Sequence, residues 1–358
     1  MGVGRRAVEG LALRVLVVGN QGYVGPVLGA HLRRVFPKAQ LIGFDAGYFA
    51  LCTTGAQVSP ERVFDTQHHG DARDLPPALL DGVDAVVALA AISNDALGAR
   101  FSGPTDAVNR GAVMRLAEMA ARAGVRRFVF ASSCSVYGFA PGEARKEGDP
   151  LNPQTAYARS KIEAETALGR LDAPGMSITC LRFATACGWS PRLRLDLVLN
   201  DFVAGALASR RIDVFSDGSP WRPLIDVADM ARAVEWALAR EGSFLAVNVG
   251  AEAWNYQVRD LAGAVAQALP GVEVAINPDA RPDTRSYKVD FSLYRRLAPD
   301  HQPRLTLEAS VARLVEGLSG MGFADAGFRA SRLMRLKMLE AHCAAGRLDS
   351  DLRWTEVA

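Results

Sequence analysis

Three glycines at intervals of three residues constrain the fold more than any other feature of this chain. Gly19, Gly22 and Gly25 follow the apolar run 14–18 and precede a stretch with helical spacing, which predicts a sharp turn between a buried strand and a helix. Glycines let the backbone turn there and approach a diphosphate, whose charge the first N–H groups of the helix would stabilise. A purely structural turn could use the same glycines, but its position in the first strand-to-helix connection favours dinucleotide binding.

The first half of the chain continues the alternation of strands and helices. Strands are expected at 14–19, 40–45, 62–65, 84–90, 127–132 and 177–186, with helices at 23–35, 106–123 and 155–171. The run from Ala85 to Ala90 is apolar at every position, as expected for a strand that is buried on both faces. The alternation predicts an α/β fold of the Rossmann type, in which helices cover both faces of a doubly wound parallel sheet.

Prolines interrupt the sequence after Gly188 and indicate a smaller, loop-rich C-terminal lobe. We expect this lobe to comprise residues 189–224 and 251–320, and the Rossmann domain to comprise residues 13–188. Residues 225–250, with a helix at 227–240 and a strand at 244–249, are expected to return to the large sheet. Residues 321–358 form a predicted helical tail, with a docked helix near 332–345.

Charge and hydropathy narrow the class of partner. Lys and Arg number 41 against 39 Asp and Glu, so the net charge of +2 offers no basic field for nucleic acid or for a membrane surface. No stretch reaches the roughly 18 uninterrupted apolar residues of a membrane-spanning helix. The run 11–18 contains Arg14 and ends in the glycine turn, which is not typical of a signal peptide. We therefore expect a cytoplasmic protein that binds small molecules.

A metal site is not expected. The five cysteines include no C-x-x-C pair, so neither a disulfide framework nor a zinc site is indicated and reduced thiols fit best. His68 and His69 are adjacent, so in a strand they would point to opposite faces, and no cluster of carboxylates or thiols supplies further ligands. We expect these two histidines in a solvated loop.

Two acidic residues follow the second and third expected strands. Asp45 ends the second strand, where a carboxylate accepts hydrogen bonds from the hydroxyls of an adenosine ribose. It would repel a 2′-phosphate, so it favours NAD over NADP; the alternative is that it only caps a loop. Asp71 either reaches the adenine edge or is an ordinary loop acid. The expected NAD-binding residues are Gly19, Gln21, Gly22, Tyr23, Val24, Gly25, Asp45, Asp71, Ala90 and Lys161.

A second pattern supplies groups for proton transfer. Tyr157 and Lys161 lie four residues apart on an expected helix, so the ammonium can sit below the phenol on one helix face. A tyrosine with its usual pKa of about 10 is a poor base at neutral pH, and a nearby cation favours the phenolate. Ser133 would share the substrate oxygen, so the three side chains could move a proton at a carbinol while hydride passes to or from a nicotinamide. A Tyr and Lys at this spacing also occur by chance on helix surfaces.

These motifs resemble one known family. The three glycines, the run S-S-x-x-V-Y-G at 132–138, Asn152-Pro153 and the Y-x-x-x-K pair are similar to the extended short-chain dehydrogenase/reductase family, specifically its nucleotide-sugar epimerase/dehydratase branch. The similarity runs from Arg14 to about Leu318. It implies a Rossmann-type NAD-binding domain, a smaller C-terminal substrate-binding lobe, and Ser133, Tyr157 and Lys161 as the catalytic set. It also implies a homodimer formed through the helices at 106–123 and 155–171.

The resemblance extends to the binding of a nucleotide-sugar substrate. Residues 217–229 resemble a segment of the family that binds the substrate diphosphate. There Arg222 would pair with a phosphate, and Arg281 stands where the family supplies a second arginine, with Arg285 as its rival. The alternative for each arginine is an ion pair on the solvated surface. Asn200 could cap the helix that faces the diphosphate.

Three positions depart from the family pattern. Thr185 stands where sugar epimerases often have Asn. The family's 4,6-dehydratases carry an Asp-Glu pair after the catalytic hydroxyl residue, where this chain has Cys134 and Ser135. A thiol beside a hydroxyl is a poor substitute for two carboxylates, which disfavours dehydration. Cys134 is better explained as a small buried residue near the nicotinamide than as an unusual acid or base.

The leading hypothesis is an NAD-dependent epimerase of a nucleotide-linked sugar, which works through a transient keto intermediate and most simply inverts C4. A net ketoreductase or dehydrogenase of a deoxysugar or polysaccharide pathway would use the same three side chains and stays an alternative. A 4,6-dehydratase is less favoured. A non-catalytic dinucleotide sensor is also less favoured, because it would not need Tyr157 and Lys161.

Overall fold

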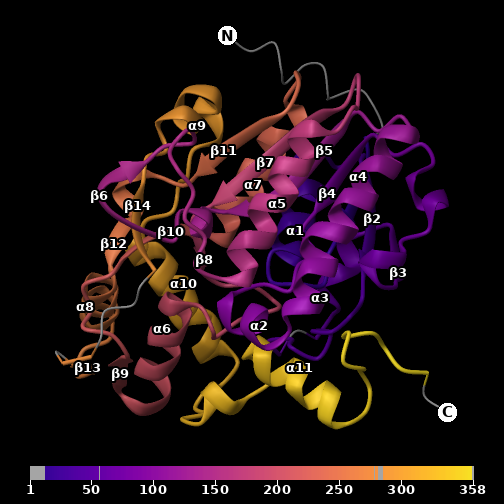
Figure 1. Ribbon diagram of the computed structural model, residues 1–358. Helices are drawn as coiled ribbons and strands as arrows, with labels where there is room; N and C mark the ends of the chain where they lie inside the picture. Colours follow the sequence, from indigo (N-terminus) through magenta and orange to yellow (C-terminus); the bar gives the residue numbers. More distant parts are fainter. Residues whose placement is uncertain (1–12, 56, 278, 281–284, 357–358) are drawn as a thin grey trace.

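A parallel sheet of seven strands lies at the centre of the molecule (Figure 1), in a computed structural model that describes residues 13–55, 57–277, 279–280 and 285–356. The strands are β1 (Arg14–Val18), β2 (Gln40–Asp45), β3 (Thr66–His69), β4 (Ala85–Ala88), β5 (Arg127–Ser133), β7 (Ser177–Phe183) and β11 (Leu245–Val249). Their order is β11-β7-β5-β4-β1-β2-β3, and all neighbouring pairs are parallel. The strand order reverses between β1 and β4, which confirms the expected doubly wound α/β fold.

Helices cover both faces of this sheet. The helices are α1 (Gly25–Val35), α2 (Asp95–Arg100), α3 (Ser102–Asp106), α4 (Val113–Arg122), α5 (Ala156–Arg170), α6 (Val198–Ser209), α7 (Val227–Ala239), α8 (Val258–Ala268), α9 (Ser292–Leu297), α10 (Leu307–Gly320) and α11 (Arg335–Ala344). Of these, α1 and α7 lie on one face of the sheet, and α4 and α5 lie on the other. Successive side chains of a strand point to opposite faces. Val15 and Val17 of β1 accordingly join one hydrophobic cluster with α1 and α7, whereas Leu16 and Val18 join another with α4 and α5.

The second lobe is built from separate stretches of chain. Its strands are β6 (Phe139–Arg145), β8 (Thr185–Cys187), β9 (Arg211–Val214), β10 (Trp221–Asp226), β12 (Asn255–Gln257), β13 (Glu273–Ile276) and β14 (Ser286–Val289). They pair as β12-β10-β8, β13-β9 and β14-β6. The chain leaves the large sheet after β7, returns through α7 to β11, and leaves again to α8. One hydrophobic cluster includes Leu28 of α1, Leu199 of α6, Leu261 of α8 and Leu314 of α10, so the two lobes share a core.

Several local expectations are wrong. Residues 60–63 form a 3₁₀ helix rather than a strand, because Pro60 starts a turn whose Glu61 N–H bonds to the Ser59 side chain. The third strand comes later, and His68 and His69 are exposed on this edge strand rather than in a loop. The expected strand 177–186 is divided between β7 and β8. The expected helix 106–123 contains a π-helical segment, Ala107–Ala112, before α4.

The C-terminal segment, which we define as residues 334–354, contains α11 and packs against the loops of the large sheet below α2 (Figure 1, yellow). Leu339, Leu348 and Leu352 join a small hydrophobic cluster with Tyr48 and Ile92. The tail is thus docked on the loops that follow β2 and β4. Within the described residues, no helix combines the length and the apolar character needed to span a membrane.

Candidate active site

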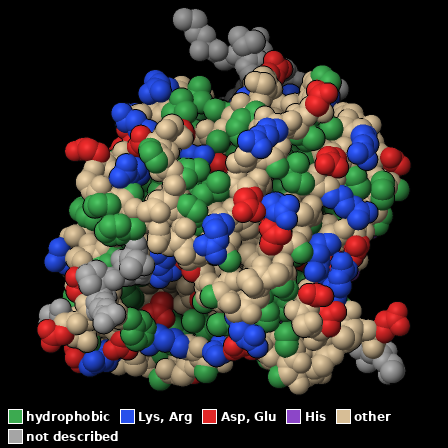
Figure 2. Space-filling view, in the orientation of Figure 1, with side chains coloured by type: hydrophobic (Ala, Val, Ile, Leu, Met, Phe, Trp, Pro, Cys, Tyr) green, Lys and Arg blue, Asp and Glu red, His purple; other side chains and the backbone are tan. Residues whose placement is uncertain are grey.

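The carboxyl ends of β1, β2, β4 and β5 border a cavity of about 840 Å³. Residues of the large sheet, such as Gly19 and Ser133, line it together with second-lobe residues such as Thr185 and Arg222. The space-filling view in Figure 2 is hollowed beside α6 and α8, and the acidic and basic side chains on that face are interspersed. Doubly wound sheets bind ligands at this edge, where the strand order reverses, so the cavity is the candidate active site.

The glycine turn forms one wall of the cavity and fits a dinucleotide diphosphate. Gly19 has a φ of +94°, and a Cβ atom added to it would lie 2.4 Å from the backbone nitrogen of Ala90. A Cβ atom on Gly25 would lie 2.0 Å from the carbonyl oxygen of Asn20. No side chain caps the first turn of α1, which leaves its N–H groups for an anion. The turn is therefore packed so tightly that Gly19 and Gly25 leave no room for a side chain.

Most of the expected cofactor residues line this cavity. Those that do are Gly19, Gly22, Tyr23, Val24, Asp45, Asp71, Ala90 and Lys161, whereas Gln21 and Gly25 do not. Asp45 accepts hydrogen bonds from the N–H groups of Gln21, at 2.9 Å, and Gly47, at 2.7 Å. Burial raises the pKa of Asp45, and these two hydrogen bonds oppose the shift. Gln21 thus acts through its backbone, by orienting the acid that ends β2.

Asp71 lies in the cavity wall and also caps a short helix, and its contact with the adenine stays a prediction. It lines the cavity, and its side chain also caps the 3₁₀ helix Ala72–Asp74 by accepting from Arg73 N at 2.8 Å. The Arg73 guanidinium pairs with the same carboxylate at 2.5 Å. This partner keeps the pKa of Asp71 below its usual value despite burial, which raises it. A ligand that contacts Asp71 would therefore meet an ion pair.

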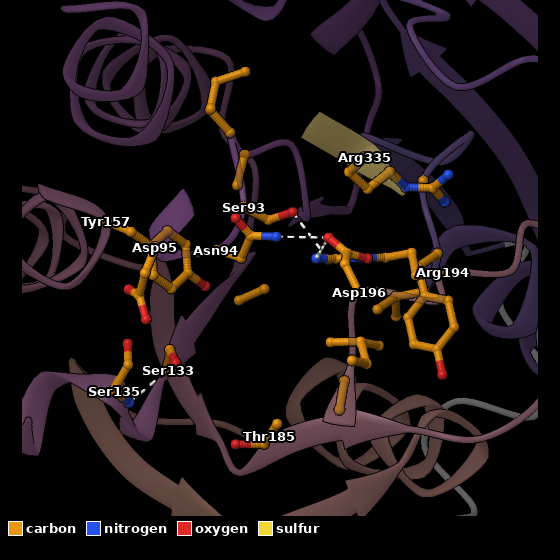
Figure 3. Close-up of a pocket in the computed structure, with 18 of the residues that line it drawn as sticks. Ser93, Asn94, Asp95, Ser133, Ser135, Tyr157, Thr185, Arg194, Asp196 and Arg335 are labelled. Atoms are coloured by element: carbon orange, nitrogen blue, oxygen red, sulfur yellow. Dashed lines mark hydrogen bonds and ion pairs between the residues drawn. The ribbon is translucent and has the colours of Figure 1, made fainter. Parts of the chain in front are cut away.

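Ser133, Tyr157 and Lys161 all line the cavity, as expected of a catalytic set. Ser133 ends β5, and Tyr157 and Lys161 lie on α5, one turn apart. Figure 3 shows the Tyr157 ring and Ser133 on the same side of the cavity, next to Asp95 and Ser135. Burial raises the pKa of Tyr157 to about 12, which the Ser133 hydroxyl and the Arg194 charge oppose.

Lys161 lies below Tyr157, though not against its hydroxyl. Its Nζ donates to the Ala131 carbonyl at 2.7 Å and lies 5.7 Å from the centre of the Tyr157 ring. Burial lowers the pKa of Lys161 to about 8, and Glu165 opposes that shift. Lys161 is therefore still largely protonated at neutral pH, and its ammonium lies between the rings of Phe130, at 4.5 Å, and Tyr157.

A polar network that sequence reasoning did not find lies across the cavity from Tyr157 (Figure 3). Arg194 donates to both carboxylate oxygens of Asp196 at 3.0 Å and to Ser93 Oγ at 3.0 Å. Asn94 Nδ2 donates to Asp196 Oδ2 at 2.6 Å. Asn94 has a φ of +92°, a costly conformation for a residue other than glycine, which this network holds in place. No spacing rule marks these residues, because they come from the separate segments that follow β4 and β8.

The expected substrate residues have different placements. Arg222 on β10 and Arg285 line the cavity, and Arg285 Nη1 pairs with Asp95 Oδ2 at 2.5 Å. Arg281 lies outside the described residues. Asn200 is buried, does not line the cavity, and cannot be the cap of α6, whose N-cap residue is Leu197.

Asn200 instead forms hydrogen bonds to the backbone of the loop before α6. Its Oδ1 accepts from Gly188 N at 3.0 Å, and its Nδ2 donates to the Arg194 carbonyl at 2.9 Å. The expectation of a cap is wrong because the side chain lies on the third residue of the helix and turns back toward the loop that precedes it. Asn200 therefore shapes the segment that carries Arg194.

Cys134 is fully buried and does not line the cavity. Its Sγ donates to the Arg182 carbonyl at 3.0 Å, and burial raises the pKa of the thiol well above its usual value. Ser135 does line the cavity, and its buried Oγ has no hydrogen-bond partner. In the part of the chain that the structure describes, no three His, Cys, Asp or Glu side chains are placed to hold a metal ion.

The sequence and the structure are similar to those of known proteins. A sequence model of the NAD dependent epimerase/dehydratase family matches residues 15–250, a range that contains the glycine turn and the three candidate catalytic residues. The chain is 26% identical over 318 residues to a dTDP-glucose 4,6-dehydratase from Actinoplanes sp., an alignment that covers 85% of this chain and 97% of that protein. It is 32% identical over 219 residues to a UDP-glucose 4-epimerase from Mycolicibacterium smegmatis, covering 60% and 69% respectively. The structure of MoeE5 in complex with UDP-glucuronic acid and NAD is similar with a TM-score of 0.73 and 25% identity, over 86% of this chain and 99% of MoeE5.

Proposed function

The chain belongs to the NAD-dependent epimerase/dehydratase family, and we propose that it is an epimerase that inverts one carbon of a nucleotide-linked sugar, most simply C4, through a transient keto intermediate. As a member of this family it is an enzyme, and its cofactor is NAD. The observation that carries the proposal is the single cavity into which the glycine turn, Ser133, Tyr157 and Lys161 all face.

The chain's own residues manage one proton in this reaction. NAD, when bound, supplies the acceptor and donor of hydride. Tyr157 takes the proton of the reacting hydroxyl and returns it after the keto sugar has turned, while Ser133 hydrogen-bonds the same oxygen. Because the pKa of Tyr157 is about 12, the reaction depends on nearby positive charge to favour the phenolate. Arg194, whose charge lowers the pKa of Tyr157, and Lys161, one turn away on α5, are two such cations.

The residues after Ser133 favour epimerisation over dehydration. Elimination of water from a keto sugar needs a second acid and base, and the Cys134 thiol is buried behind the wall with a raised pKa. Ser135 offers only a hydroxyl. Asp95 is a carboxylate in the cavity, but its Oδ2 pairs with Arg285. An epimerase needs no second pair, since Tyr157 serves both half-reactions.

We also propose Arg222 and Arg285 as ligands of the substrate diphosphate. Both line the cavity from the second lobe, and a planar guanidinium suits bidentate contact with phosphate oxygens. The role considered for Arg281 stays a prediction. The homodimer that the family resemblance implies through α4 and α5 also stays a prediction.

The products of the holoenzyme test the proposed reaction. Incubation with UDP-glucose or dTDP-glucose is expected to give an epimer of unchanged mass, seen by NMR, without net change in NADH absorbance. A product lighter by one water would indicate a dehydratase. Consumption of NADH in step with product would indicate a ketoreductase, and either result would contradict the proposal.

Asp45 is expected to set the preference for NAD over NADP. The wild type should bind NAD at least about tenfold more tightly, because the carboxylate at the end of β2 repels a 2′-phosphate. Asp45→Asn removes the charge with little change in shape. It should therefore improve NADP binding and reduce the difference in affinity between NAD and NADP. Titration of both cofactors into wild type and variant measures this. Equal affinities in the wild type would remove the role assigned to Asp45.

A further inference from the structure

Hydrogen bonds and aromatic contacts hold the C-terminal segment against the loop that follows β2. Trp354 Nε1 donates to the Ala46 carbonyl at 2.6 Å, and Tyr48 Oη donates to the Leu352 carbonyl. The rings of Tyr48 and Trp354 also lie 5.8 Å apart. Because Ala46 and Tyr48 line the cavity, the last part of the chain stands directly behind the wall that begins at the end of β2.

The same segment places Arg335 in the cavity wall. Arg335 is the first residue of α11 and is only 1% exposed. Its Nη2 donates to the Arg192 carbonyl at 2.8 Å, and its guanidinium lies 4.4 Å from the centre of the Phe49 ring. Its Nη1 is buried without a hydrogen-bond partner. Figure 3 shows Arg335 and Tyr157 on opposite sides of the cavity.

The charge of Arg335 is not balanced by the residues around it. The buried arginines of the described chain are Arg182, Arg192, Arg194 and Arg335, and the first three pair with Glu165, Glu61 and Asp196 at 2.7, 2.8 and 3.0 Å. Arg335 forms no ion pair with any described residue. The nearby Asp196 is already held by Arg194 and Asn94. Burial lowers the pKa of Arg335 to about 10, as expected of a cation without a counter-ion.

We propose that Arg335 binds the diphosphate of NAD, so that the C-terminal segment forms part of the cofactor site. A diphosphate supplies the anionic oxygens that the unpartnered Nη1 lacks, and contact with it would balance a charge that is costly to bury alone. The glycine turn would hold the diphosphate from the side of α1, and Arg335 from the side of α11.

The neighbours of Arg335 favour the cofactor diphosphate over that of the substrate. Phe49, on which the guanidinium stacks, follows Asp45 by four residues in the loop after β2. Arg192, which accepts from Arg335, follows Ser190, whose Oγ donates to the carbonyl of Tyr23 in the glycine turn at 2.7 Å. The arginines proposed for the substrate diphosphate come instead from β10 and the segment before β14.

Two variants separate a binding role from a structural one. Arg335→Met removes the charge and keeps much of the side-chain length, and Arg335→Lys keeps the charge without the planar fork. In full-length protein freed of cofactor, calorimetry should show NAD binding weakened about 10- to 100-fold by Arg335→Met and by less in Arg335→Lys. Native mass spectrometry should show the same order of NAD retention in the purified holoproteins. Lys337→Met, at an exposed position of the same helix, should match the wild type.

Thermal stability provides a second test, because a binding role and a structural role of Arg335 predict different changes in Tm. Without cofactor, Arg335→Met should melt no lower than the wild type, because it no longer buries an unbalanced charge, yet it should gain less in Tm when NAD is added. A variant that melts lower and keeps the full NAD-dependent gain in Tm would show that Arg335 only supports α11. Wild-type NAD affinity in Arg335→Met would overturn the proposal directly.

The source of the diphosphate is tested with simpler probes. Arg335→Met should bind adenosine and UDP as the wild type does, since adenosine lacks a diphosphate and UDP represents the substrate end. A loss of affinity confined to UDP would assign Arg335 to the substrate diphosphate and refute the proposal. Because these are binding measurements, they stand even if the reaction proves to be other than epimerisation.

Discussion

Replacing Tyr157 with phenylalanine is expected to lower kcat about 10²- to 10⁴-fold, the range for loss of a positioned acid or base. The substitution removes only the phenol oxygen and leaves the ring in place above Lys161, so NAD should stay bound. Steady-state kinetics on a nucleotide-sugar substrate, with the NAD content of the protein measured alongside, would check both statements.

A second tyrosine provides the control. Tyr294→Phe removes a buried hydroxyl that donates to the His301 carbonyl at 2.7 Å outside the cavity, so its kcat should match the wild type. The pH profile adds a further readout. In the wild type kcat should rise with pH as more of the Tyr157 phenol ionises, and rise less above about pH 8, where Lys161 loses its proton. Full turnover in Tyr157→Phe would move the base to another residue, and Asp95, which lies beside Tyr157 in Figure 3, would be the first candidate.

Replacing Glu165 with alanine is expected to lower the free energy of unfolding by about 3–5 kcal/mol, the cost of breaking a buried ion pair from one side. Glu165 lies one turn after Lys161 on α5, and both of its carboxylate oxygens accept hydrogen bonds from Arg182 on β7. Ser132 Oγ also donates to Glu165. The variant leaves the Arg182 charge buried without its partner. Urea denaturation of variant and wild type at comparable slopes would measure the loss.

Two further variants show whether the loss of stability in Glu165→Ala comes from the unpaired charge. Glu163→Ala, at an exposed position of the same helix, should change the free energy of unfolding by no more than about 0.5 kcal/mol. The double variant Glu165→Leu with Arg182→Met replaces the pair by apolar side chains and should recover much of the stability. If the double variant were as unstable as Glu165→Ala, the cost would come from lost packing and not from an unpaired charge.

The sequence predicts the fold well where one local pattern decides it. The continuous apolar runs of β1 and β4, the glycine turn and the spacing of Tyr157 and Lys161 each depend on residues close together in the chain. The sequence does not reveal strand β3, because Thr66–His69 is a polar edge strand and burial leaves no hydrophobic pattern in it. The 3₁₀ helix before it depends on a single capped turn.

The cavity is harder to predict because its polar groups meet only in three dimensions. Asp196 and Asn94 are separated by about a hundred residues, and nothing near either one indicates the other. Arg335 lies in a tail whose helical character is visible in the sequence, but its missing counter-ion is visible only once the burial and pairing of all neighbouring arginines are known. For Asn200 the sequence suggests a role that the structure does not bear out. The side chain does not cap a helix but forms hydrogen bonds to the backbone of the buried loop that precedes α6.

The repeated passage of the chain between the two lobes bears on how the enzyme unfolds. Cutting any one connection would not release either lobe, and the hydrophobic cluster shared by α1, α6, α8 and α10 leaves the second lobe without a core of its own. The two lobes should therefore lose structure in one cooperative step, as a single domain does. A substitution far from the glycine turn, in α8 or α10, would then reduce the population of intact cofactor sites as directly as one beside it.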